Sequence, residues 1–150
     1  MVASELGAQV EACEFCAIVR GDDVSVEVVC EGEAWLAFFP LDPATPGHTL
    51  VVPRRHVSNL WEADAALGAE LMTAVIRVGR AIRAVLAPAG MNLITSAGQA
   101  AEQTVYHLHL HVLPRWHADR MDQIWPEKDE RQDADLHGLA NRIRKTCEGV

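Results

Sequence analysis

The segment YHLHLHVLP, residues 106–114, places three of the chain's seven histidines at every second position, with leucines between them. A period of two is that of a β-strand, in which successive side chains point to opposite faces. His107, His109 and His111 are therefore predicted to line one face, and the apolar residues between them the other. We expect the apolar face to pack against a core and the histidine face to serve a polar function.

Hydrophobic patterning around this segment predicts a small set of helices and strands. Apolar positions that recur every three or four residues predict a long amphipathic helix over about 64–86, ended by Pro88 and Gly90. A second helix is predicted over 135–147. Runs rich in valine and aromatic residues, bounded by glycine and proline, predict strands at 24–30, 34–39, 48–53, 91–95 and 105–113.

The order of these elements and the length of the chain indicate the fold class. Consecutive strands with one long helix and a C-terminal helix indicate an α+β protein, with an antiparallel sheet of about five strands. The 150 residues suffice for one core and are few for two. We expect a single domain over 1–150, with a loose lead-in at 1–12 and a tail at 116–150 that holds the second helix.

Composition and charge argue against some classes of partner. Acidic residues outnumber basic ones by 21 to 13, and this net charge of −8 opposes attraction to a nucleic-acid backbone or an anionic membrane. A small phosphorylated ligand needs only local donors and is not excluded. No apolar stretch approaches the ~20 residues that cross a bilayer, and no basic and apolar leader begins the chain. The expectation is a cytoplasmic protein without nucleic-acid or membrane partners.

Several residues have the chemistry of metal ligands or catalysts. Cys13 and Cys16 form a C-x-x-C pair, which in a reducing compartment indicates metal binding or redox chemistry more often than a structural disulfide. Alternate residues of a strand are ~6.6 Å apart, so His107 and His111, ~13 Å apart, cannot easily share one ion with the histidine between them. A two-histidine metal pair, a row of acid, base and nucleophile groups, and a polar face without a special role stay open.

Three segments together resemble the histidine triad (HIT) superfamily of nucleotide hydrolases and transferases. They are CEFC at 13–16, PGHTLVVPRRH at 46–56 and AEQTVYHLHLHVLPR at 101–115. The third segment looks closer to the branch that splits dinucleoside polyphosphates, whereas the short chain suits either that branch or the phosphoramidate hydrolases. The resemblance implies a HIT-like fold, a purine nucleotide substrate cleaved at its α-phosphorus, and a homodimer.

The resemblance also implies catalytic roles. His109 matches the family's nucleophile, which forms a nucleotidyl-histidine intermediate that water then hydrolyses. A neutral imidazole is a good nucleophile near neutral pH, and two steps avoid a difficult direct attack by water. His111 is expected to hold the second ring position of the active row, and His48 to donate to that row or orient it.

A structural metal site follows from the same resemblance. In family members with an N-terminal C-x-x-C, zinc is held by positions that match Cys13, Cys16, His56 and His107 here. Two sulfurs and two nitrogens suit tetrahedral Zn²⁺. Because four protein ligands close the site, no catalytic metal is expected.

The resemblance also implies nucleotide contacts, but some of these positions hold a different residue from the one common in the family. Gln103 and Thr104 match polar positions that contact the phosphates and the leaving-group side. Pro40 stands where the family has an acidic residue or asparagine for the ribose, so Asp42 is the candidate substitute. Ser96 takes the place of an asparagine near the phosphates, and Glu102 that of a glycine.

Two further hypotheses differ in class from the leading enzyme hypothesis. A nucleotide-binding regulatory module with little turnover would explain the departures at Pro40, Ser96 and Glu102, although the presence of His109 speaks against it. A zinc-dependent hydrolase built on His107 and His109 would lose its activity on chelation.

Overall fold

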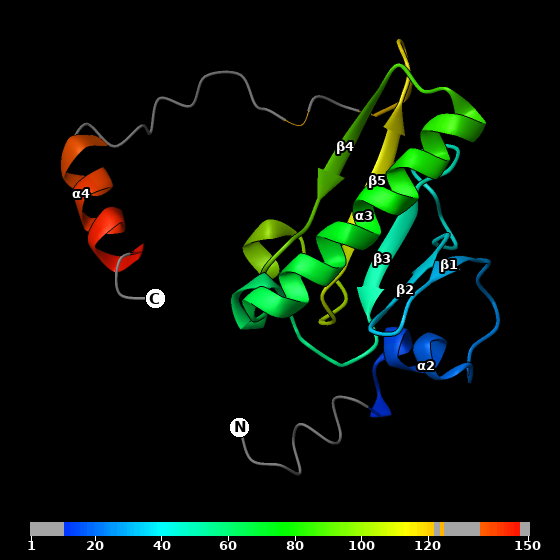
Figure 1. Cartoon of the computed structure of the whole chain (residues 1–150), viewed down its shortest axis with the longest axis horizontal. Helices are drawn as coiled ribbons and strands as arrows, with labels where there is room; N and C mark the ends of the chain where they lie inside the picture. Colours follow the sequence, from blue (N-terminus) through cyan, green and yellow to red (C-terminus); the bar gives the residue numbers. More distant parts are fainter. Residues whose placement is uncertain (1–10, 122–123, 125–135, 148–150) are drawn as a thin grey trace.

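One five-stranded antiparallel sheet, with the strand order β1-β2-β3-β5-β4, organises the chain (Figure 1). The computed structural model describes residues 11–121, 124 and 136–147. The strands are β1 (Val28–Glu31), β2 (Trp35–Phe38), β3 (Thr49–Pro53), β4 (Gly90–Ile94) and β5 (Leu110–Arg115). The helices are α2 (Glu14–Arg20), α3 (Ala65–Leu86) and α4 (Leu136–Cys147), with 3-10 turns η1 (Leu60–Glu62) and η2 (Gln99–Ala101). The predicted α+β class is confirmed.

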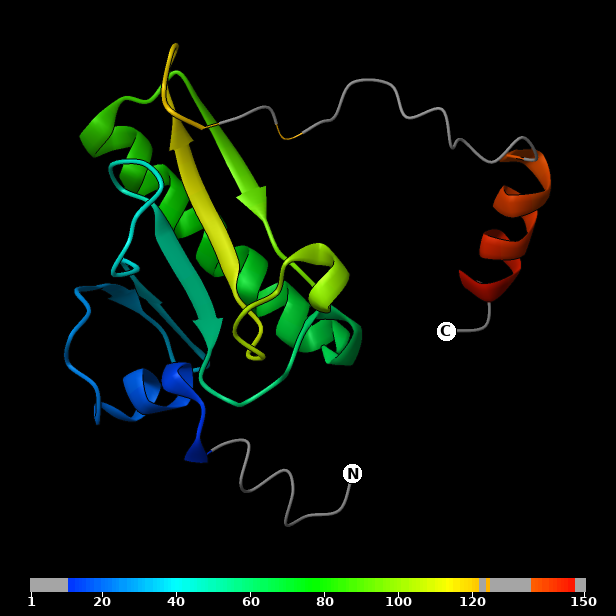
Figure 2. The same cartoon turned by 180° about the vertical axis from the view of Figure 1, so that it is seen from behind.

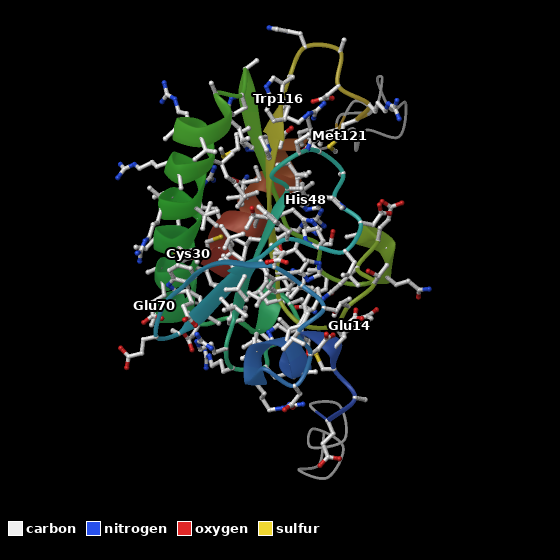
Figure 3. The ribbon with its side chains drawn as sticks, turned by 90° about the vertical axis from the view of Figure 1, so that its right-hand side faces the viewer. Glu14, Cys30, His48, Glu70, Trp116 and Met121 are labelled. Atoms are coloured by element: carbon white, nitrogen blue, oxygen red, sulfur yellow. The ribbon has the colours of Figure 1, made fainter. Side chains whose placement is uncertain are left out.

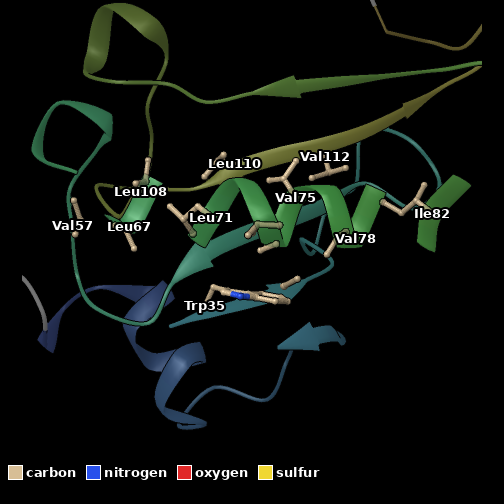
Figure 4. Close-up of a cluster of buried hydrophobic side chains, with 13 residues drawn as sticks. Trp35, Val57, Leu67, Leu71, Val75, Val78, Ile82, Leu108, Leu110 and Val112 are labelled. Carbon is tan, nitrogen blue, oxygen red and sulfur yellow. The ribbon is translucent and has the colours of Figure 1, made fainter. Parts of the chain in front are cut away.

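The long helix α3 covers one face of the sheet (Figure 2). It begins where the sequence indicates, because the Asp64 side chain caps it by accepting a hydrogen bond from the backbone N–H of Leu67 at 2.8 Å. Its buried stripe packs with Leu108, Leu110 and Val112 in a single apolar cluster (Figure 4). Each buried aliphatic side chain of this kind contributes about 1.5–3 kcal/mol to folding.

The opposite face of the sheet carries a second apolar cluster. The residues of β2 and β3 that alternate with those facing α3 form it together with two side chains of α2: Phe15, Ile18, Leu36, Phe38, Leu50 and Val52. The alternation predicted for the histidine segment is thus present, since its leucines lie on the α3 side. The histidines lie on the face that α2 borders.

The histidine segment differs from its prediction in where the strand begins. A strand is predicted over 105–113, but β5 runs from Leu110 to Arg115, and residues 105–109 lie outside it. Pairing with β3 reaches only as far as Val51 opposite Leu110, and Pro53 has no N–H to extend the ladder. Pro114, expected to end the strand, lies within β5 opposite Met91. It is tolerated there because β3 pairs with β5 only between Leu110 and Val112, so Pro114 has one neighbouring strand.

Helix α2 is not predicted from the sequence, because seven residues are too few to show a period. Its ends are set by Cys13, the N-cap, and by Gly21, which ends the helix in the left-handed region with φ 79°. The predicted C-terminal helix is found as α4, in which no described side chain is buried. Residues 125–135 of the predicted tail lie outside the described residues. No helix in the described ranges is long and apolar enough to cross a membrane.

Candidate active site and metal centre

Four predicted metal ligands, Cys13, Cys16, His56 and His107, meet at the N-terminal end of α2. Their Sγ and ring nitrogen atoms all lie within 4.8 Å of one another. Nδ1 of His107 is 3.6 Å from Sγ of Cys13 and 3.5 Å from Sγ of Cys16. Nδ1 of His56 lies 3.3 Å from Sγ of Cys16. The structure thus brings together residues that are far apart in the sequence.

The surroundings of this cluster suit a metal ion. Nε2–H of His107 donates to the carbonyl oxygen of Pro53 at 2.8 Å, which leaves Nδ1 free to act as a ligand. Burial is the largest cause that lowers the pKa of His107, to about 4. The ring therefore stays neutral, as binding to a metal ion requires. Burial also raises the pKa of the Cys16 thiol to about 11, so an ion would be needed to favour its thiolate. Two sulfur and two imidazole donors fit Zn²⁺.

His48 and His111 form a hydrogen-bonded pair whose direction is set by the backbone. Nδ1 of His48 accepts from the backbone N–H of Ala44 at 3.1 Å, so neutral His48 carries its proton on Nε2. That Nε2–H donates to Nδ1 of His111 at 2.9 Å. The proton of neutral His111 therefore lies on its own Nε2, which is left as a donor.

His109 has the opposite tautomer from His111. Its Nδ1–H donates to the backbone carbonyl of His107 at 2.7 Å, which leaves the Nε2 lone pair free. The ring centroids of His109 and His111 are 4.9 Å apart. A ring with a bare nitrogen thus neighbours a ring with an N–H donor, on the face of the sheet away from α3, where Figure 3 shows His48 and Glu14.

Burial is the main reason why these rings stay uncharged. It is the leading cause that lowers the pKa of His48, of His109 and of His111, the last to about 4. The neighbouring histidines lower the pKa of His111 further, whereas the hydrogen bond to His107 and the charge of Glu14 oppose the effect at His109. The rings are neutral at pH 7, the state that a nucleophile needs.

The residues that are predicted to contact the nucleotide differ from one another in burial and in hydrogen bonding. Gln103 is buried, and its amide donates to the carbonyls of Ser58 and Val105 and accepts from the N–H of Gly98. Its side chain thus fixes the loop after η2. Thr104 is exposed and lines a cavity of about 610 Å³ beside the metal ligands. Ser96 is half-buried after β4, and Asp42 is exposed in the loop between β2 and β3.

Two features of the site were not foreseen from the sequence. Phe15, between the two cysteines, packs its ring against histidines of the site. The backbone groups of Ala44 and Pro53 set the tautomers of His48 and His107. Backbone donors and acceptors leave no signal in side-chain identity, whereas a large aromatic residue inside a C-x-x-C pair is a signal that could have been used.

Replacing Gly47 by alanine is expected to lower the free energy of unfolding by about 1–3 kcal/mol. Gly47 precedes His48 and has φ 79°, a backbone conformation that is strained for alanine, and an added Cβ would also displace the end of the Leu86 side chain. Gly68→Ala is the matched control, because nothing lies near its added Cβ and alanine stabilises a helix interior by about 0.5–1 kcal/mol. Urea unfolding measures both variants. Equal stability of the two would contradict the prediction.

Comparison with known proteins places the chain in a family. The HIT domain matches residues 23–118, and the chain belongs to the HIT family. Protein hit of Bacillus subtilis is 36% identical over 137 residues, which cover 90% of this chain and 94% of that protein. Adenylylsulfatase HINT3 of Arabidopsis thaliana is 28% identical over 138 residues, 89% of this chain and 68% of that protein.

Solved structures of the family have the same fold. A HIT family protein from Bacillus anthracis superposes with a TM-score of 0.81 at 30% identity, covering 93% of this chain and 98% of the other. A Zn-bound histidine triad family protein from Mycobacterium smegmatis has a TM-score of 0.70 at 33% identity, covering 92% and 99%. The membership of the HIT family that the sequence indicates is therefore confirmed.

Proposed function

We propose that this protein cleaves a purine nucleoside phosphate derivative, a phosphoramidate or a dinucleoside polyphosphate, at its α-phosphorus through a nucleotidyl-histidine intermediate. The observation that carries the proposal is the pair of opposite tautomers. His109 presents a bare Nε2, held by its Nδ1–H bond to the carbonyl of His107, and beside it His111 presents an N–H. A nucleophile and a donor for developing charge are what phosphoryl transfer requires.

The reaction proceeds in two balanced steps. In the first, Nε2 of His109 forms a bond to the α-phosphorus as the bond to the leaving group breaks, and the leaving group takes up a proton from solvent. In the second, water attacks the phosphorus and releases a proton to solvent, the P–N bond breaks, and nucleoside monophosphate leaves with regenerated His109. Nε2–H of His111 stabilises the phosphoryl oxygens in both steps, and His48 keeps that proton in place.

This function is tested by comparing two substrates and by detecting the adduct from the intact mass of the protein. The purified protein is incubated with a fluorogenic adenosine phosphoramidate and, in parallel, with diadenosine triphosphate, and quenched samples are weighed intact. Turnover of either substrate with a nucleotidyl adduct supports the proposal and identifies the branch. Tight nucleotide binding without turnover would favour the alternative, a nucleotide-binding regulatory module. The exposed position of Glu102 speaks against that alternative, because its carboxylate is free to turn from bound phosphate.

We further propose that the Cys13, Cys16, His56 and His107 cluster holds a structural Zn²⁺. Four protein ligands leave no open position, so no catalytic metal is expected. The Zn-bound relative supports this. The zinc-dependent hydrolase hypothesis has less support, because His109 is not part of the cluster and its Nδ1 bonds to the backbone. The free cysteines suit a reducing compartment, and we infer a cytoplasmic location.

The dependence of activity on pH should reflect the buried histidines. Neutral rings are required, and the pKa values of His48, His109 and His111 lie below the ordinary 6.5. As pH falls, kcat/KM is therefore expected to decline with a midpoint below pH 6.5, because each of the three pKa values is lowered and that of His111 lies at about 4. Rates in constant ionic strength buffers check this, with circular dichroism as the control for folding. A midpoint at 6.5 would contradict it.

Self-association through the edge strand β4 is a further part of the proposal. Among the strands of the described ranges β4 has one neighbour, and Met91 and Leu93 on it are 40% and 43% exposed. An unpaired edge with exposed apolar side chains suits a symmetric homodimer. Leu93→Glu is expected to halve the mass measured by light scattering. Val24→Glu, at an exposed position outside the strands, is the control, and a wild-type monomer would refute the dimer.

A further inference from the structure

Phe15 stands between the two cysteines of the metal cluster and contacts the proposed nucleophile. Its ring is 8% exposed. The centroid of that ring lies 5.3 Å from the centroid of His109, with the two planes at 88°, and 6.0 Å from that of His107. On its other side, Phe38 packs edge-on at 5.5 Å. The phenyl ring therefore packs between Phe38 of β2 and the histidine row.

A hydrogen bond from Nδ1 is one restraint on the ring of His109. The torsion that turns a histidine ring about its Cβ–Cγ bond has a broad, roughly two-fold distribution, so packing is needed to select one orientation. The perpendicular contact with Phe15 supplies that packing, because edge-to-face aromatic pairs have a preferred geometry. The contact and the hydrogen bond together hold Nε2 in one direction.

The same short helix also carries one of the metal ligands, Cys16, and is capped by another, Cys13. Seven residues do not form a stable helix in water without tertiary contacts. α2 is anchored by Cys13 and Cys16 in the cluster and by Phe15 and Ile18 in the apolar core. The order of the metal cluster is thereby coupled to the position of the phenyl ring that borders His109.

We propose that Phe15 is a positioning residue for His109, and that it transmits the order of the metal-binding helix to the attacking nitrogen. This inference rests on the proposed function, in which His109 is the nucleophile. Phe15 supplies no proton and forms no bond to the substrate in the reaction. Its effect is expected in the rate of the covalent step, since a small misplacement of a reacting atom can cost up to about 100-fold.

The test compares Phe15→Ala with Ile18→Ala in zinc-loaded protein. Both variants truncate a buried side chain of α2 with 8% exposure and keep every metal ligand, but the ring contacts with histidine belong to Phe15 alone of the two. For Phe15→Ala we expect kcat to fall about 10- to 100-fold with KM within about twofold of wild type. For Ile18→Ala we expect both constants within about twofold.

A second measurement does not depend on turnover. The ¹⁵N chemical shifts of the His109 imidazole report which nitrogen carries the proton. We expect a single Nδ1–H tautomer in wild type and in Ile18→Ala, and shifts averaged between tautomers in Phe15→Ala. If Phe15→Ala fails to fold or to retain zinc, Phe15→Leu, which is closer in volume, is used with the same expected results.

Three results would overturn the inference. A rise in KM at constant kcat would make Phe15 a binding residue, and equal losses in both variants would make its role merely structural. Unchanged ¹⁵N shifts in Phe15→Ala would show that the hydrogen bond alone orients His109. Absence of turnover and adduct in wild type would count against the proposed function, whereas the tautomer measurement would still decide whether Phe15 positions the ring.

Discussion

Replacing His109 by alanine will lower kcat by about 10⁴-fold or more and remove the nucleotidyl adduct from quenched samples. The reason is chemical, because the P–N bond of the proposed intermediate forms at Nε2 of this residue. Binding should survive, since the net charge and the loop fixed by Gln103 are unchanged. Single-turnover kinetics and intact mass measure the loss.

His117→Ala is the matched control for His109→Ala. His117 is exposed and follows β5, outside the row of buried histidines, so its removal should leave kcat within about twofold of wild type. Full activity of His109→Ala, or an adduct that persists in it, would show that another group attacks the phosphorus. Calorimetric titration with adenosine monophosphate would separate loss of chemistry from loss of binding.

Removal of zinc is expected to lower the free energy of unfolding by about 4 kcal/mol. The reference state is protein with free zinc at a concentration about a thousandfold above its Kd. Four donors already lie within 4.8 Å of one another, so an ion that binds them in the folded chain stabilises that state. The measurement is urea unfolding before and after chelation, with the zinc content determined by mass spectrometry.

Cys16→Ser and Cys30→Ser form the control pair for this prediction. Cys16 belongs to the cluster, whereas Cys30 is partly buried at β1 and packs against the α3 cluster. Only Cys16→Ser should lose zinc and become insensitive to the chelator. Protein that is free of zinc and equally stable with or without added metal would favour the redox interpretation of the C-x-x-C pair.

Much of this site could be predicted from the sequence, because its patterns are periodic or its residue types are chemically distinctive. The alternation of histidine and leucine predicts two faces, and Leu108 and His107 indeed lie on opposite sides. Asp64 marks the start of α3 through its capping bond. The metal cluster required the family resemblance, since no local pattern connects Cys13 with His107 across the chain.

The remainder depends on tertiary contacts that sequence patterns do not record. The strand was expected from Val105, yet the ladder begins at Leu110 because Pro53 ends the pairing of its neighbour. Helix α2 owes its existence to packing and to the cysteine cap. The direction of the His48 and His111 pair is decided by a peptide N–H, which every residue except proline possesses.

The dependence of this pair on a backbone N–H affects which substitutions the site tolerates. The N–H of Ala44 fixes the direction of the hydrogen bonds that run through His48 to His111. That direction is independent of which side chain stands at position 44. Substitutions there can accumulate freely as long as none is proline, even though Pro43 and Pro46 stand close by. The chain thus keeps the proton between His48 and His111 in place with a group that amino-acid replacement can scarcely remove.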